Sequence, residues 1–172
     1  MNLLVWLFGL ILANFLFIVL RGAPYVPTKR GGIDELFSLV KLGPNDIIVD
    51  LGSGDGRVLA AASKRGINSV GYELNPFLAL ISRFTLRRLR PRPKVVLADF
   101  WLSALPSDTK VVFVFLGGPF MHKLEQKLQA EASRLGHDLT LVSYGVPLKG
   151  RKPIATSKSC LVYRFSASGD QA

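Results

Sequence analysis

After residue 45 the chain alternates between stretches with strand periodicity and stretches with helical periodicity. Short runs of β-branched and other apolar residues predict five strands, at residues 47–51, 69–73, 94–99, 110–116 and 139–145. Apolar residues at helical spacing lie between them, and the longest such helix is expected from Met121 to Leu135. Because strands that are apolar on both faces belong to buried parallel sheets, we expect an α/β fold with helices on both faces.

Local signals predict three further elements. Ile33 to Leu42 predict a helix before the first strand, and Gly43-Pro44 ends it. Asn75-Pro76 predicts the start of a helix that reaches about Leu89. Residues 159–166 predict a last strand that follows a proline-containing loop rather than a full helix. We therefore expect this strand to pair antiparallel, at or near an edge of the sheet.

The N-terminal segment from Leu3 to Leu20 has no charge and one polar side chain, Asn14. As a helix it would be about 27 Å long, close to the ~30 Å hydrocarbon core of a bilayer. We predict an uncleaved transmembrane anchor over residues 1–21. A cleaved signal peptide usually begins with basic residues, which Met1-Asn2 lacks, and a buried core helix is rarely apolar on all sides. These remain the two alternatives.

Charge places the remainder of the chain relative to this anchor. The 22 Lys and Arg exceed the 12 Asp and Glu, which gives a net charge of +10. Arg21, Lys29 and Arg30 follow the apolar segment and no basic residue precedes it. The positive-inside rule therefore predicts a single-pass protein whose catalytic domain lies on the cytoplasmic side, or on the matrix side in a mitochondrion. Residues 22–45 are expected to be a linker and first helix, and 46–172 the main domain.

A ligand-binding turn is predicted where the first strand meets the next helix, in the segment VDLGSGDGR at 49–57. A dinucleotide motif, G-x-G-x-x-G, would require glycine where this chain has Arg57, and its pyrophosphate would be repelled by Asp50 and Asp55. S-adenosylmethionine has no phosphate and carries cationic groups that suit carboxylates. We expect it to be the cofactor, bound by residues of this turn: Asp50, Gly52, Ser53, Gly54, Asp55 and Gly56.

Further candidate ligand contacts follow the second and third strands. Glu73 lies 21 residues after Gly52, where an acid accepts hydrogen bonds from ribose hydroxyls. Asn75 follows it, and Asp99 with Phe100 suits an adenine ring. Each also has a simpler interpretation: Asp55 as a turn residue, Glu73 as a helix cap, and Phe100 and Trp101 as core residues. A lone Cys with two distant His residues predicts neither a disulfide nor a zinc site.

These motifs together resemble the class I S-adenosylmethionine-dependent methyltransferases. More narrowly, the chain is similar to membrane-anchored lysine methyltransferases of the adenine nucleotide translocase and of the ATP synthase c subunit, with their prokaryotic relatives. The similar segments are PYVPT (24–28), VDLGSGDGR (49–57), GYELNP (71–76), ADFW (98–101) and VSYG (142–145). The resemblance implies a Rossmann-like sheet, mostly parallel with an antiparallel C-terminal strand. It also implies that Asp50, Gly52, Gly54 and Asp55 hold the methionine part, Glu73 the ribose, and Asp99 with Phe100 the adenine.

The same resemblance implies that Tyr25 and Thr28 close over the donor from the linker. Methyl transfer needs alignment and a neutral amine, and aromatic side chains around a lysine would favour loss of its proton. We expect four aromatic side chains to supply such walls: Tyr25, Trp101, Phe120 and Tyr144. The predicted function is protein-lysine N-methylation of a membrane protein. The alternatives are an RNA or small-molecule methyltransferase of this fold, and a non-catalytic donor-binding module at the membrane.

A basic cluster follows the helix that begins at Pro76. It comprises Arg83, Arg87, Arg88, Arg90, Arg92 and Lys94. Such a cluster could contact anionic lipid headgroups or RNA, or form a solvated helix face. Because the anchor favours lipid, we expect the bilayer rather than nucleic acid to be a partner.

Overall fold

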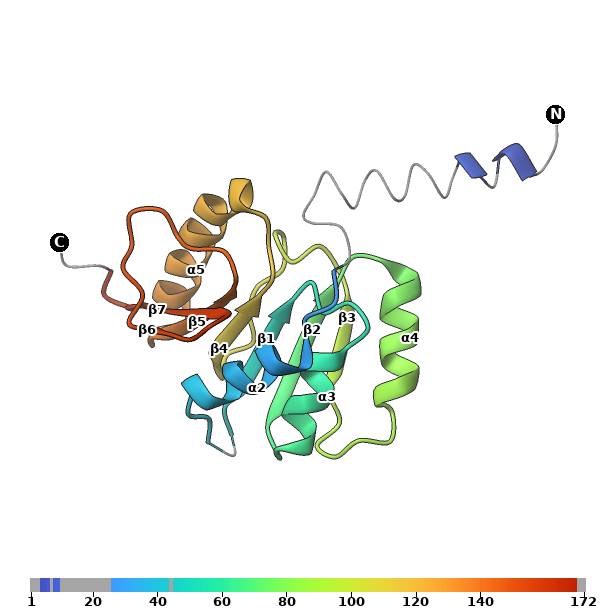
Figure 1. Ribbon diagram of the computed structural model, residues 1–172, viewed down its shortest axis with the longest axis horizontal. Helices are drawn as coiled ribbons and strands as arrows, with labels where there is room; N and C mark the ends of the chain where they lie inside the picture. Colours follow the sequence, from blue (N-terminus) through green and yellow to red (C-terminus); the bar gives the residue numbers. More distant parts are fainter. Residues whose placement is uncertain (1–3, 7, 10–25, 44, 170–172) are drawn as a thin grey trace.

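The computed structural model describes residues 4–6, 8–9, 26–43 and 45–169, and their main feature is a seven-stranded sheet (Figure 1). The strands are β1 (Ile47–Leu51), β2 (Asn68–Glu73), β3 (Lys94–Leu97), β4 (Thr109–Val114), β5 (Leu139–Tyr144), β6 (Ala155–Thr156) and β7 (Cys160–Phe165). The helices are α2 (Arg30–Leu39), α3 (Arg57–Lys64), α4 (Pro76–Leu86), the short 3-10 turn η1 (Gly118–Phe120) and α5 (Met121–Leu135).

The strand order is β3-β2-β1-β4-β5-β7-β6. Strands β1 to β5 pair in parallel, and β7 pairs antiparallel with both β5 and β6. The prediction of a mostly parallel sheet with an antiparallel C-terminal strand is confirmed. The chain reverses its direction of winding between β1 and β4, and open α/β sheets bind ligands at the carboxyl ends of the strands beside such a switch point.

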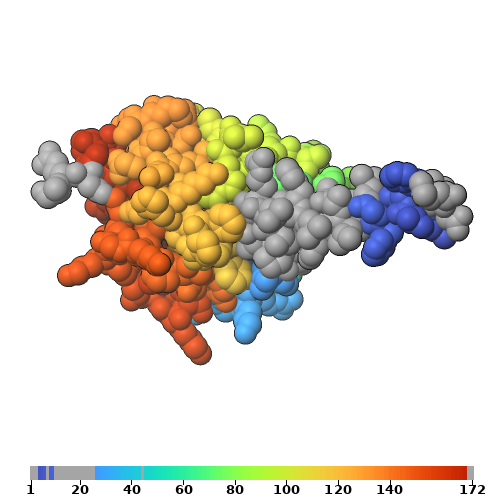
Figure 2. Space-filling model, turned by 90° about the horizontal axis from the view of Figure 1, so that it is seen from above, coloured from blue at the N-terminus to red at the C-terminus, as the bar shows by residue number. Residues whose placement is uncertain are grey.

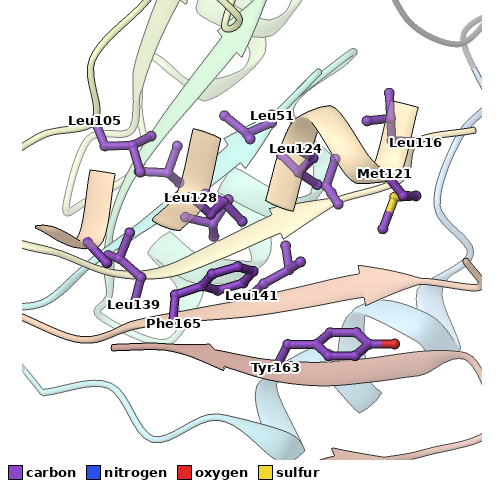
Figure 3. Close-up of a cluster of buried hydrophobic side chains, with 14 of the residues drawn as sticks. Leu51, Leu105, Leu116, Met121, Leu124, Leu128, Leu139, Leu141, Tyr163 and Phe165 are labelled. Atoms are coloured by element: carbon purple, nitrogen blue, oxygen red, sulfur yellow. The ribbon is translucent and has the colours of Figure 1, made fainter. Parts of the chain in front are cut away.

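Helices cover both faces of the sheet, as the apolar strands predict. Ile48 of β1 packs with α2 and α3, whereas its neighbour Val49 faces the other way and packs with α5. In Figure 3, Leu124 and Leu128 of α5 point toward the strands that carry Leu141 (β5) and Phe165 (β7). Successive residues of a strand point to opposite faces, so β1 contributes to both cores.

The observed ends of α4 follow from its flanking residues. Asn75 caps the helix: its side-chain oxygen accepts hydrogen bonds from the amides of Phe77 at 2.9 Å and Leu78 at 3.4 Å. Pro76 is the first helical residue, so the predicted start is confirmed. The helix ends at Leu86, three residues before the predicted end near Leu89.

Strand β6 is an element that the sequence pattern did not predict. It consists of two residues, Ala155 and Thr156, which pair with Val162 and Leu161 of β7. Two residues are too short to show a strand period, so only the pairing with β7 identifies them as a strand.

Most of the predicted anchor over residues 1–21 lies outside the described residues. Where the structure does describe the chain, it contains no helix with the length and hydropathy that crossing a membrane requires. Leu4, Val5, Trp6 and Phe8, which are described, are exposed.

Candidate active site

The glycine-rich loop between β1 and α3 is held against the end of β2 by its own amides. The amides of Gly52 and Ser53 donate to the carbonyl of Tyr72 at 2.9 and 3.0 Å. The Gly54 amide donates to Oε2 of Glu73 at 2.7 Å, and the Gly56 amide donates to the Ser53 carbonyl at 2.9 Å. A pyrophosphate would need such amides as donors, but these already have protein acceptors. The loop is therefore poorly suited to a dinucleotide.

The glycines of this loop differ in what they do. Gly52, Gly54 and Gly56 have φ values of 87°, 54° and 81°, in the region that favours glycine. A Cβ at Gly52 would meet no atom within 4 Å, so the backbone there is open to a ligand. A Cβ at Gly56 would overlap the hydroxyl of Ser82 in α4. Gly56, predicted as a cofactor residue, therefore also permits α3 and α4 to pack closely.

Ser53, another predicted cofactor residue, is buried beneath the loop. Its Oγ lies 2.5 Å from the position that a Cβ at Gly71 would occupy, so the side chain packs against β2. Among the described residues this hydroxyl has no hydrogen-bond partner. Only glycine at position 71 leaves room for this arrangement.

Glu73 links three segments of the predicted site. The carboxylate is buried, and its Oε1 accepts from the amide of Asn75 at 2.7 Å while Oε2 accepts from Gly54. A carboxylate oxygen has a second lone pair, so these bonds leave capacity for the ribose hydroxyls expected there. The bond from the Gly54 amide also positions the glycine loop, and the sequence did not predict this second role of Glu73.

Asp50 ends up buried beside two other acids. Burial, with the negative charges of Glu73 and Asp55, raises the pKa of Asp50 to about 8. Asp99 lies two residues after β3, so carboxylates converge on this edge from β1, β2 and the segments that follow β1 and β3. A cationic sulfonium and ammonium would relieve this concentration of negative charge, whereas a pyrophosphate would increase it. The residues present therefore fit S-adenosylmethionine.

Arg57 connects the loop to the linker that precedes α2. Its guanidinium donates two hydrogen bonds to Asp55: Nε donates to Oδ1 at 3.0 Å, and the terminal nitrogen Nη2 donates to Oδ2 at 2.7 Å. The other terminal nitrogen, Nη1, donates to the carbonyl of Thr28 at 3.0 Å, and Thr28 is buried. The linker therefore lies beside the loop, as the expected role of Thr28 requires. Tyr25 lies outside the described residues.

The sequence did not predict a role for Arg57 in the site. Its position nevertheless carried a signal, because Arg57 stands where a dinucleotide motif would have its third glycine. The guanidinium of Arg57 binds the Asp55 carboxylate and the Thr28 carbonyl, and a glycine at this position could form neither contact.

Two aromatic groups, one of three rings and one of two, flank the edge where the strands end. Trp101 lies 4.6 Å from Phe100 and 6.4 Å from Phe120 between ring centroids, and all three pack against the core on the α5 face. The Oδ1 of Asp99 accepts from the Trp101 amide at 2.9 Å, so Asp99 also serves as a turn residue. Lys123 of α5, which the sequence did not single out, places Nζ 4.4 Å from the Trp101 ring centroid.

The second group, a pair, lies on the other face of the sheet. Tyr144, at the end of β5, packs edge-on against Phe115 at 4.8 Å and touches Gly32 of α2. The structure therefore places Trp101 and Tyr144 on the same edge but on opposite faces. Figure 2 is viewed from above this edge, where the segment that includes α5 (amber) and the segment that follows β5 (orange) are visible.

Comparisons with known proteins agree with this geometry. A crystal structure of an RNA methyltransferase from Salinibacter ruber, in complex with S-adenosyl-L-homocysteine, has a TM-score of 0.71 and 26% sequence identity, and covers 83% of this chain and 94% of that chain. The fold is therefore that of the Rossmann-like methyltransferases.

Two curated relatives are lysine methyltransferases. The lysine N-methyltransferase of the ATP synthase c subunit from Xenopus laevis is 37% identical over 110 residues, which are 63% of this chain and 48% of that protein. The adenine nucleotide translocase lysine N-methyltransferase of Mus musculus is 37% identical over 135 residues, which are 77% of this chain and 57% of that protein. The chain thus spans about half the length of these relatives. A family model described as the ANTKMT methyltransferase domain matches residues 50–155, which is more than half of the chain. This chain therefore belongs to the ANTKMT methyltransferase domain family.

Proposed function

We propose that this chain is an S-adenosylmethionine-dependent protein-lysine N-methyltransferase that acts on a membrane protein. The observation that carries the proposal is the cluster of acids at the carboxyl ends of β1, β2 and β3, beside a glycine loop whose amides are bound to β2. This acidic cluster suits a cationic donor without phosphates. The names of the relatives, both lysine N-methyltransferases, supply the acceptor class.

The donor would be held by residues of the three strand ends. Asp50 and the open backbone at Gly52 would face the methionine part, and Glu73 would accept from the ribose hydroxyls. Phe100, beside Asp99, would face the adenine. Arg57 would keep the linker at Thr28 against the loop and so limit the entry of water.

The acceptor lysine must arrive as a neutral amine aligned with the donor. When bound, the donor supplies a methyl group: the lysine nitrogen forms the new N–C bond, the C–S bond breaks, S-adenosylhomocysteine leaves and the amine proton passes to water. Aromatic walls at Trp101, Phe120 and Tyr144 would desolvate an ammonium and favour its loss of a proton. Tyr25 would add to these walls from the linker.

Membrane attachment belongs to the same proposal. Residues 3–20 are long and apolar enough for a single span, and Arg21, Lys29 and Arg30 follow it. The catalytic domain would then lie on the cytoplasmic side, or on the matrix side in a mitochondrion. An anchored enzyme is held near acceptors that are themselves in the bilayer.

The test uses the full chain, isotopically labelled donor, and membranes from cells that lack the gene. We expect label on the side-chain nitrogen of lysine in a membrane protein, located by mass spectrometry of peptides. Asp50→Ala should abolish the product, and Asp34→Asn, which removes an exposed acid on α2, should not. A chain that binds the donor yet labels no protein would overturn the proposal in favour of a non-catalytic module.

RNA methylation is the second candidate, because the Salinibacter ruber neighbour is an RNA methyltransferase and this chain has a basic cluster. The same reaction with total RNA added separates the two. Label that enters RNA and spares protein lysines would replace the first proposal with the second.

A further inference from the structure

Helix α4 exposes a stripe of large apolar side chains. Phe77, Leu80, Ile81 and Phe84 are 69%, 65%, 50% and 65% exposed, and their spacing places them on one face of the helix. The opposite face, with Ala79, Ser82 and Leu86, is buried against the sheet. Figure 1 shows α4 at the outer side of the sheet, beyond β3. The surface of a soluble monomeric protein rarely carries so many large apolar side chains together unless a partner binds there.

Cations accompany the apolar stripe along the chain, and the segment that holds it contains no acid. Arg83 lies in α4, the loop that follows carries Arg87, Arg88, Arg90 and Arg92, and Lys94 begins β3. The sequence has no Asp or Glu between Glu73 and Asp99. The Arg87 guanidinium lies 3.5 Å from the centroid of the Phe84 ring, so the charged and apolar parts are continuous.

The loop that carries the cations is fastened to the domain. The hydroxyl of Ser63 in α3 donates to the Pro91 carbonyl at 2.6 Å, and Nε of Arg83 donates to the Val95 carbonyl at 3.1 Å. The cations are therefore presented at a defined place beside the stripe.

We propose that this α4 surface, the stripe Phe77, Leu80, Ile81 and Phe84 with its bordering cations, lies in the headgroup region of an anionic bilayer. A helix that lies in the membrane plane buries its apolar face at the acyl boundary and pairs its cations with lipid phosphates. RNA would satisfy the cations but leave the four apolar side chains in water. A symmetric dimer through this face would bring two clusters of like charge together.

This docking deepens the proposed function and rests on it. Phe77 is four residues beyond Glu73, so a membrane-bound α4 would hold the carboxyl edge of the sheet at the bilayer surface. The enzyme would then have two attachments, the N-terminal anchor and α4, and would select lysines within the headgroup region. Lysines on domains far from the membrane would be out of reach.

The experiment places a polarity-sensitive fluorophore on the stripe of the full chain. The native Cys160 is buried, and burial raises the pKa of its thiol to about 11, so it should not compete for the label. Leu80→Cys carries the probe, and Ala130→Cys, at an exposed position of α5 on the other face of the sheet, is the matched control. Both proteins are reconstituted into phosphatidylcholine vesicles with and without phosphatidylglycerol.

We expect a blue shift and protection from aqueous iodide for the probe at position 80 on anionic vesicles, and neither for the probe at 130. Replacing Arg88, Arg90 and Arg92 by glutamine should reverse the shift. Equal signals from both positions, on protein that floats with vesicles and binds donor, would overturn the docking while leaving the proposed function intact. A shift induced by RNA alone, or one that grows with protein concentration without vesicles, would overturn it in favour of nucleic acid or a second copy.

A kinetic arm links the surface to its role. Leu80→Gln with Phe84→Gln should lower methylation of an acceptor in vesicles but leave methylation of the same acceptor in detergent unchanged. Equal rates for variant and parent in vesicles would count against the docking, and loss of activity in both settings would count against it too.

Discussion

The Glu73 carboxylate lies 2.7 Å from the amide of Gly54, so an acid at the end of β2 holds the glycine loop that follows β1. Its other oxygen accepts from the Asn75 amide, at the start of α4. One buried side chain therefore joins the two segments that would surround the donor. Removing it should affect the shape of the site as well as a ligand contact.

Glu73→Gln is expected to weaken both the fold and donor binding. A glutamine has a single acceptor oxygen, so one of the two backbone amides would lose its partner, at about 1–3 kcal/mol for a buried donor. Thermal unfolding should report this loss, and calorimetry should show at least about a tenfold weaker donor affinity, since 1.4 kcal/mol is tenfold. Asp34→Asn removes a charge from an exposed ion pair and should change neither.

Donor affinity is expected to rise with pH up to about 8. Below that value Asp50 is protonated in the free protein, and a cationic donor must displace the proton before the carboxylate can pair with it. The affinity should increase by up to about tenfold per pH unit from about pH 6 and level off above the pKa. Asp50→Asn should bind weakly and show no such slope. A flat wild-type profile would contradict the assignment.

The same pKa predicts the stability of the protein without donor. The folded state holds a proton on Asp50 up to about pH 8, whereas an unfolded aspartate loses it near 3.8. Between these values the folded state binds more protons, so the contribution of Asp50 to stability should fall as the pH rises. Denaturant unfolding of the parent and of Asp50→Asn across this range measures the difference between them.

Arg57→Lys is expected to loosen the linker. A lysine cannot make the bidentate contact with Asp55 while also reaching the Thr28 carbonyl. The residues involved are about a third exposed, so we expect a loss of about 1 kcal/mol, or roughly fivefold in donor affinity. Hydrogen exchange should become faster at residues 26–30.

Arg65→Lys is the matched control for this change. Arg65 forms a similar pair with Asp34 at 2.8 Å, away from the loop. The control should leave donor affinity and the exchange of residues 26–30 unchanged. If the two variants behave alike, the linker is not held through Arg57.

Gly32→Ala is expected to displace Tyr144. A Cβ at Gly32 would overlap the Tyr144 ring, and overpacking of this kind costs about 1–3 kcal/mol. Because the ring belongs to the proposed acceptor walls, methyl transfer should fall while donor binding is kept. The penalty should shrink in a Tyr144→Val background, where the ring is absent.

The neighbouring glycine provides the control. A Cβ at Gly31 meets nothing within 4 Å, so Gly31→Ala should be neutral or stabilise the helix by about 0.5–1 kcal/mol. Equal unfolding temperatures for the two alanine variants would show that Tyr144 does not pack against position 32 in solution.

The sequence by itself determined the order of the elements and the chemistry of the loop. Alternation and helical spacing are local properties, so the five parallel strands and α5 were predicted from short windows. The start of α4 was predicted from the Asn75 cap and Pro76, and the acids at 50, 73 and 99 from their places at strand ends.

Only the tertiary structure decided which contacts these residues make. Gly56 touches Ser82, Ser53 fills the space above Gly71, and Arg57 binds the linker, all through residues distant in the sequence. The periodicity of α4 is satisfied by two apolar faces, one through Ala79 and Leu86 and one through Leu80 and Phe84. Helical spacing cannot tell which face the sheet covers, because burial depends on the packing partner. The exposed stripe beside the cations therefore became visible only in the folded protein.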